Sequence, residues 1–257
     1  MSVTGEIFER RLDWGRVTSQ TAAVLGRQPV LILGLGIVLG GLPSIVNAFT
    51  MGDQLANPRA MWSSGLYWIW MLVSLLFTSF AQAALYRVIF TALGNRQPSL
   101  GDVLATGGKF FLPLFAVNLL YYLAVVLGMI LLIVPGVMMG VAWCVVGPAL
   151  IAERSGITAV FGRSAELTRN HRWSIFGLAV VFAIGIMIIE GVLGAIGLAR
   201  GFNFAAAAIV SPVAIIGAGV VSGLVTAIGA TVLATLYAEL RELKEGLSGE
   251  SLADVFD

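Results

Sequence analysis

Six long stretches of the sequence are almost entirely apolar, and short segments between them hold most of the charged residues. A helix that crosses a membrane needs about 20 mostly apolar residues. The apolar runs are continuous and do not alternate with polar residues, which favours helices over the short strands of a membrane barrel. The predicted spans are residues 29–48, 65–84, 110–134, 137–152, 174–198 and 205–237. The pattern therefore predicts an all-α polytopic membrane protein, a bundle of six transmembrane helices.

The third and fourth spans come from one uncharged region, residues 110–152. As a single helix this region would be about 64 Å long, about twice the hydrocarbon thickness, so the chain must turn back. Pro135 and Gly136 are the expected hinge, because proline lacks a helix donor and glycine tolerates a turn. Pro148 is expected to kink the fourth span. These breaks would alternatively mark a translocation site, but the sequence shows no repeated halves, and the hairpin interpretation is favoured.

Composition changes this picture little and excludes several classes of protein. The chain has 58% apolar and 11% charged residues, against about 45–50% and 25% in soluble domains. One water-soluble core cannot hide that excess, so a soluble globular enzyme is excluded. A net charge of +1 gives no basic footprint for nucleic acid. The single Cys144 and the single His171 cannot form an intramolecular disulfide or a histidine-rich metal site, and we expect no metal and no cofactor.

Positive charge falls almost entirely on one side of the predicted spans. The N-terminal segment, the second loop, the fourth loop and the C-terminal tail hold four, three, four and two Lys or Arg residues, 13 in all. The opposite side holds only Arg59 and Arg200. Loops on the cytosolic side carry such an excess, so both termini are predicted to be cytosolic. The 28 mixed residues before the first span argue against a cleavable signal peptide.

The segments outside the spans are expected to lie at the membrane surface. Residues 1–28 and the fourth loop have the composition of interfacial helices, and residues 238–257 form an acidic tail that ends as a short helix near Gly246. In the fourth loop, basic residues beside a tryptophan suit anionic lipid headgroups, although a simple positive-inside anchor is the favoured interpretation. The candidate headgroup contacts are Arg163, Arg169, Arg172 and Trp173.

Three polar residues within the spans are candidates for an intramembrane site. Glu190 lies about 24 Å into its helix, and ionisable residues at such depth face the bundle interior or a water-filled cavity. It would couple protons or substrate, or else pair with Arg200 or Arg59. Asn118 is expected to form a hydrogen bond between helices, and Gln82 is the third polar position. All three are structural by default, with a functional role for Glu190 as the open alternative.

Two pairs of glycines have the spacing of close helix packing in membranes. They are Gly36 with Gly40 and Gly219 with Gly223. The spacing predicts a tight helix–helix contact. It leaves open whether that contact packs the bundle or forms the face of a homodimer.

Several motifs together resemble a known bacterial family. Residues 131–136 (LLIVPG), 148–154 (PALIAER) and 162–173 (GRSAELTRNHRW) follow one another as in the membrane domain attached to some glycerophosphodiester phosphodiesterases and its stand-alone relatives. The tail, residues 237–246 (YAELRELKEG) and 252–257 (LADVFD), is similar to stand-alone members. The resemblance implies a six-helix protein of the bacterial inner membrane. It implies no activity, because the catalytic domain of those enzymes is a barrel of about 250 residues that uses two histidines.

Motifs for catalysis are missing from the sequence: it has no nucleophile elbow, phosphate loop or paired-histidine metal motif. We therefore expect a non-enzymatic protein that organises lipid or partner proteins in the bilayer. Its basic interfacial helices would contact anionic headgroups. The alternative is a carrier for a lipid or a small amphipathic solute. The carrier would use Glu190 and the helix break at Pro135 and Gly136.

Overall fold

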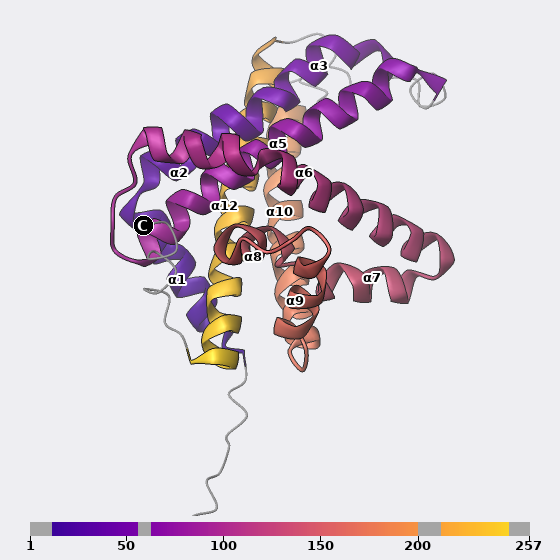
Figure 1. Ribbon diagram of the computed structural model, residues 1–257. Helices are drawn as coiled ribbons and strands as arrows, with labels where there is room; N and C mark the ends of the chain where they lie inside the picture. Colours follow the sequence, from indigo (N-terminus) through magenta and orange to yellow (C-terminus); the bar gives the residue numbers. More distant parts are fainter. Residues whose placement is uncertain (1–11, 56–62, 200–211, 247–257) are drawn as a thin grey trace, which may run out of the picture.

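The computed structural model describes residues 12–55, 63–199 and 212–246. Within these ranges the chain is helical apart from short turns and contains no strand (Figure 1). The helices are α1 (Trp14–Arg27), α2 (Pro29–Leu35), the π-helix η1 (Gly36–Gly41), α3 (Leu42–Leu55), α5 (Gly65–Leu93), α6 (Leu100–Leu131), α7 (Ile133–Ala142), α8 (Val146–Glu153), α9 (Ala159–Leu167), α10 (Arg172–Ala199) and α12 (Pro212–Glu245).

Six helical segments are long and apolar enough to cross a membrane, which confirms the predicted all-α polytopic class. They are Pro29–Phe49, Gly65–Leu93, Leu100–Leu131, Ile133–Glu153, Arg172–Ile189 and Ile215–Glu245. Several helices extend beyond the predicted apolar runs. The helix that contains the third run begins at Leu100, where Ser99 caps it by accepting a hydrogen bond from the Asp102 N–H. A helix can begin with a polar turn outside the hydrocarbon region, so hydropathy alone does not show where a helix begins.

The first candidate span is one continuous helical path with a π-helical turn, η1, in its middle. Pro43 follows η1, and a proline ring clashes with the carbonyl four residues earlier in a regular α-helix. Widening the turn before Pro43 relieves that clash. It also places Gly36 and Gly41 of η1 against α12, where both are buried.

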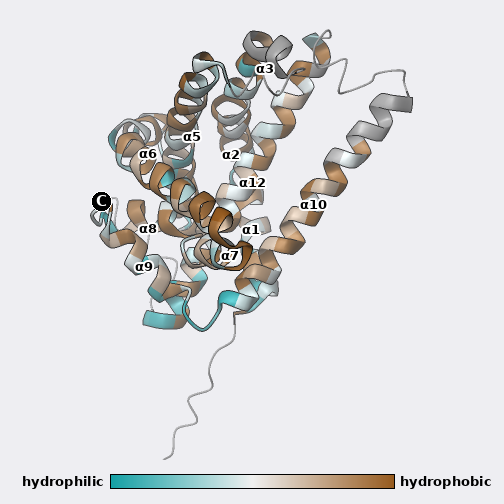
Figure 2. Ribbon diagram, turned by 90° about the vertical axis from the view of Figure 1, so that its right-hand side faces the viewer, coloured by the Kyte–Doolittle hydropathy of each residue, from teal (hydrophilic) through white to brown (hydrophobic). Residues whose placement is uncertain are grey.

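The most densely packed core lies where α1, the end of α5, α8 and the second half of α12 meet. Its largest buried side chains include Tyr86, Phe90 and Tyr237. Other helices keep much of their apolar surface exposed, as expected of helices that face lipid. α10 stands apart from the other helices over much of its length (Figure 2).

The sequence-based position of the hairpin hinge was wrong by three residues. The chain turns back at Leu132, an extended residue between α6 and α7, whereas Pro135 and Gly136 both lie inside α7. Proline is tolerated there because the N–H groups of a first helical turn have no helical partner anyway. A Cβ at Gly136 would lie 2.6 Å from the Met129 nitrogen, so the role of Gly136 is to let α7 approach α6.

The kink of the fourth span likewise comes before its proline. α7 ends at Ala142, and α8 begins at Val146 with Pro148 in its first turn. The hydroxyls of Ser164 on α9 and of Thr168, which caps the end of α9, both donate hydrogen bonds to the Ala142 carbonyl, at 3.0 and 3.1 Å. Side chains from another helix thus satisfy an acceptor that the break sets free.

Candidate functional site at the polar end

Hydrophilic residues gather at one end of the bundle, which we name the polar end (Figure 2). Contacts between distant segments link the four basic segments to other parts of the chain, three of them to one another. Arg16 Nη2 of α1 lies 2.9 Å from Glu242 Oε1 of α12, and Arg27 donates to the Ala92 carbonyl at the end of α5, at 2.8 Å. The fourth loop joins the end of α12 through Arg163.

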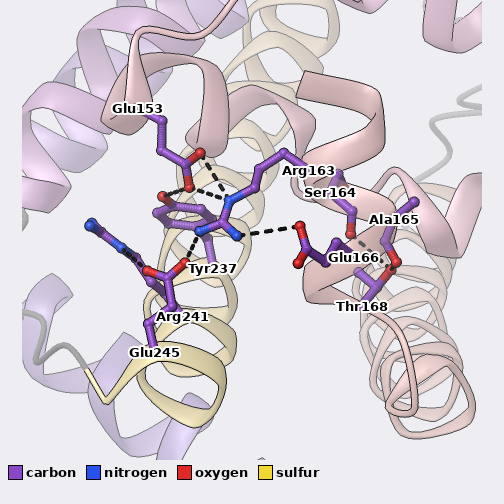
Figure 3. Close-up of polar contacts among 9 residues, drawn as sticks. All are labelled: Glu153, Arg163, Ser164, Ala165, Glu166, Thr168, Tyr237, Arg241 and Glu245. Carbon is purple, nitrogen blue, oxygen red and sulfur yellow. Dashed lines mark hydrogen bonds and ion pairs between the residues drawn. The ribbon is translucent and has the colours of Figure 1, made fainter. Parts of the chain in front are cut away.

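Arg163 lies at the centre of a cluster of opposite charges (Figure 3). Its Nε donates to both carboxylate oxygens of Glu153, at 2.8 and 3.0 Å. A second nitrogen forms an ion pair with Glu245, which also accepts from Arg241 Nε at 3.0 Å. The Tyr237 hydroxyl donates to Glu153 at 2.9 Å and completes what we call the Arg163 cluster.

Three short pieces of helix position this cluster. Glu153 is the last residue of α8, which the left-handed residue Arg154 terminates. Arg163 lies in the second turn of α9. Tyr237, Arg241 and Glu245 follow one another at intervals of four residues on α12, and residues four apart share a helix face. That spacing is the one signal in the sequence that could have suggested the cluster.

The carboxylates around Arg163 hold its charge firmly. Partial burial by itself lowers the pKa of Arg163, but hydrogen bonds to Glu153 and Glu245 outweigh that effect, and the pKa is raised. The guanidinium also lies 3.7 Å from Glu166. The contact of Arg163 with anionic headgroups stays a prediction, and the structure disfavours it, because its charge is already compensated by carboxylates of this chain.

The other candidate headgroup residues stay at the surface. Arg169 is exposed, Trp173 is 86% exposed, and the side chain of Arg172 is half-buried between them. The Trp173 ring packs edge-on against Phe176 with ring centroids 6.1 Å apart. Together they place two cations and a large aromatic ring at the start of α10, on the polar end.

Polar residues predicted within the spans are only partly brought together. The Asn118 amide nitrogen donates to Ser79 Oγ and to Gln82 Oε1, each at 3.0 Å, which confirms the hydrogen bond predicted between helices. Asn118 is buried between α5 and α6. Glu190 belongs to α10, but its side chain lies outside the described residues, as do its candidate partners Arg59 and Arg200.

The two glycine pairs face each other inside the chain. A Cβ at Gly36 would lie 2.6 Å from the Gly223 carbonyl oxygen, and one at Gly40 would lie 2.9 Å from Thr226 Cβ. A Cβ at Gly223 would lie 2.5 Å from Ile37 Cα, and one at Gly219 would lie 2.2 Å from Ile45 Cγ1. This geometry favours packing within the bundle over the face of a homodimer, because a homodimer that used these glycines would have to displace α12 from η1.

Two contacts at the polar end have no counterpart among the predicted sites. The hydroxyls of Thr21 and Thr235 are 2.9 Å apart in the buried contact between α1 and α12. Glu239 is 1% exposed, and it forms an ion pair with Arg16 at 3.4 Å. The hydrogen bond to Glu242 is the main cause of a raised pKa at Arg16. An acidic tail gives no sign in sequence that one of its carboxylates is buried.

The fold and the polar end define an all-α, multi-pass membrane protein with a compensated ion-pair cluster at one end. The part of the chain that the structure describes holds no group of three or more His, Cys, Asp or Glu residues placed to bind a metal ion. Residues 151–240 match a family described as a domain of unknown function, DUF7847. The match runs from the end of α8 into α12 and includes Glu153, Arg163 and Tyr237. Comparisons with curated proteins and with solved structures give no match.

Proposed function

We propose that this chain is a non-enzymatic protein of the bacterial inner membrane that organises anionic lipids at its cytosolic, polar end. The observation that carries the proposal is the group of Arg169, Arg172 and Trp173 at the start of α10, in which Arg169 and Trp173 are exposed and Arg172 is half-buried. Tryptophan favours the headgroup level of a bilayer, and each basic residue near an anionic surface contributes about 1 kcal/mol.

The rest of the polar end forms a structural frame that holds this group in place. Arg163 is neutralised by Glu153 and Glu245, and α9 is fixed to the end of α7 through Ser164 and Thr168. The start of α10 follows α9 by only a short turn. The resemblance to the stand-alone membrane domains of the phosphodiesterase family supports the inner-membrane location and the lack of an enzymatic role.

Native mass spectrometry of the purified protein tests the proposal. The protein is equilibrated with an equal mixture of phosphatidylglycerol and phosphatidylcholine, and the bound lipids are compared with the mixture. We expect phosphatidylglycerol to be enriched in the wild type. In Arg169→Gln/Arg172→Gln the enrichment should fall by about tenfold or more, since about 1 kcal/mol per residue is about fivefold each.

Two matched variants separate this group from charge in general. Lys109→Gln/Arg154→Gln also removes two positive charges from basic segments, and it should keep the enrichment. Arg163→Gln should keep it too while lowering the melting temperature, because Arg163 serves the ion-pair cluster. Equal loss in both double variants, or no enrichment in the wild type, would contradict the proposal.

The carrier hypothesis is tested in the same experiment through Glu190→Gln. A carrier that holds its lipid at Glu190 loses bound lipid in this variant, whereas a headgroup site at the polar end does not. We expect Glu190→Gln to bind the two lipids as the wild type does.

A further inference from the structure

The tip of the α6–α7 hairpin is the most exposed apolar segment that the structure describes. Five consecutive residues, 130–134 (ILLIV), are each between 68% and 78% exposed. Leu127 and Met138 on the two arms continue the same exposed surface. No charged residue lies between Lys109 and Glu153 in the sequence. The apolar surface of the tip is therefore unsuited to water.

The hairpin is closed tightly along its length. A Cβ at Gly128 would lie 2.9 Å from Gly136 Cα, and the Tyr121 hydroxyl donates to the Gly140 carbonyl further down, at 3.4 Å. Small residues of this kind let helix backbones approach within a membrane. The two arms thus pack as one compact unit that ends in the tip.

The tip does not reach the far end of the bundle. In Figure 1 the α6–α7 hairpin runs obliquely to α10 and α12, and its tip lies well short of the end at which α3 finishes and α5 begins. Figure 2, turned by 90°, looks onto the α6–α7 hairpin and shows that its ribbon is strongly hydrophobic. The other candidate spans extend closer to the far end.

Backbone geometry at the turn limits the cost of placing it in hydrocarbon. Unpaired N–H and C=O groups are expensive there, and a long irregular loop would expose many of them. This turn has a single non-helical residue, Leu132, whose N–H donates to the Gly128 carbonyl at 3.0 Å. The Leu132 carbonyl accepts from the Gly136 N–H at 3.4 Å, and Pro135 has no N–H to satisfy.

From these observations we infer that α6 and α7 form a re-entrant hairpin whose tip stays among the lipid acyl chains and does not cross the bilayer. The chain then crosses the membrane fewer times than its six apolar segments suggest. The topology predicted from the Lys and Arg counts is unaffected. A hairpin returns to the side from which it started whether or not it crosses, so the second and fourth loops stay on one side. This inference does not depend on the headgroup proposal, since it concerns depth in the bilayer and not lipid class.

Site-directed labelling tests the inference in the full-length protein. In a Cys144→Ala background, which removes the single cysteine, we introduce Leu132→Cys, Gln97→Cys or Ser63→Cys. Gln97 and Ser63 are exposed residues before α6 and before α5, and the topology predicted from the Lys and Arg counts places them on opposite membrane faces. Intact cells and inverted vesicles are treated with a membrane-impermeant maleimide. Gln97→Cys should be labelled from one membrane face only and Ser63→Cys from the opposite face only. Leu132→Cys should be labelled from neither face until the protein is denatured in SDS.

A spin label on the Leu132→Cys variant distinguishes lipid from protein as the cover. Collision with oxygen should exceed collision with a water-soluble nickel chelate by at least fivefold if acyl chains surround the tip. Labelling of Leu132→Cys from the face of Ser63→Cys would show a crossing hairpin, and labelling from the face of Gln97→Cys would show a tip in water. Protection from both oxygen and nickel would show that protein covers the tip. Each of these three results overturns the inference.

Discussion

Tyr237 shows how one residue joins the apolar core to the ion-pair cluster. Its ring packs against Phe90 with centroids 6.0 Å apart, and its hydroxyl donates to Glu153 at 2.9 Å. The same side chain therefore contributes buried area on one side and a hydrogen bond to a charged acceptor on the other. Its position on α12 fixes that helix relative to the end of α8.

Tyr237→Phe keeps the ring and removes the hydrogen bond to Glu153. We expect the free energy of unfolding to fall by about 1.5 kcal/mol, the lower end for a charged acceptor, because Glu153 is 22% exposed. Reversible unfolding in mixed micelles measures the change. Tyr122→Phe, at a tyrosine that is 49% exposed, is the matched control and should leave stability unchanged.

Asn118 and Gln82 allow a measurement of the polar contact between α5 and α6. A double-mutant cycle with Asn118→Leu and Gln82→Leu should give a coupling energy of about 0.6–1.7 kcal/mol, the range for such hydrogen bonds inside membrane proteins. The same unfolding assay reports it. Additive effects of the two substitutions would mean that the hydrogen bond at 3.0 Å contributes nothing to stability.

At the scale of elements, the contact between η1 and α12 depends on the absence of side chains. Gly36 and Gly41 of η1 meet Gly219 and Gly223 of α12 at distances that leave no room for a Cβ. Backbone atoms block most of that room, and backbone cannot rotate away as a flexible side chain does. The π-helical turn before Pro43 and the glycines of α12 thus form one packing unit.

Gly223→Ala should weaken this unit, because the new Cβ would lie 2.5 Å from Ile37 Cα. Overpacking of this kind costs about 1–3 kcal/mol, and we expect the upper end of that range as a lower melting temperature. Gly217→Ala on the same helix is the control, since nothing lies within 4 Å of its Cβ position. It should leave the melting temperature unchanged or raise it slightly. Equal losses in both variants would argue against the close contact.

At the scale of the whole molecule, α1 connects the first part of the chain to the last. It packs on α12 through Val17, Thr21 and Val24, buried at intervals of four and three residues, and Arg16 pairs with Glu239 and Glu242. This contact brings two segments more than 200 residues apart to the same end of the bundle.

Cross-linking checks that arrangement. In the Cys144→Ala background, Thr21→Cys/Thr235→Cys should form a disulfide readily on mild oxidation, because the two hydroxyl oxygens are 2.9 Å apart. Thr18→Cys/Thr235→Cys should not, since Thr18 lies on the exposed face of α1. The mobility of the protein on non-reducing gels reports the product. Cross-linking in the second pair alone would place the other face of α1 on α12.

Part of the site could be predicted from the sequence, and part could not. The hydrogen bond of Asn118 followed from a buried amide in an apolar helix, which must find a partner. Arg163 was expected at the headgroups because its neighbours in sequence are basic, yet Glu153 and Glu245 neutralise it from other helices. The hairpin turn was placed at a proline because proline cannot donate, whereas the chain breaks three residues earlier, at Leu132.

The all-α class and the six apolar segments follow from the order of residues alone, because the bilayer imposes a length and a hydropathy that each segment must meet on its own. Contacts in the folded chain show which glycines meet, which arginine is neutralised and where the α6–α7 hairpin turns. Each of those depends on contacts between residues far apart in the chain, such as Arg163 with Glu245, 82 positions away. Hydropathy carries no information on such pairs, since it describes each segment of the chain by itself.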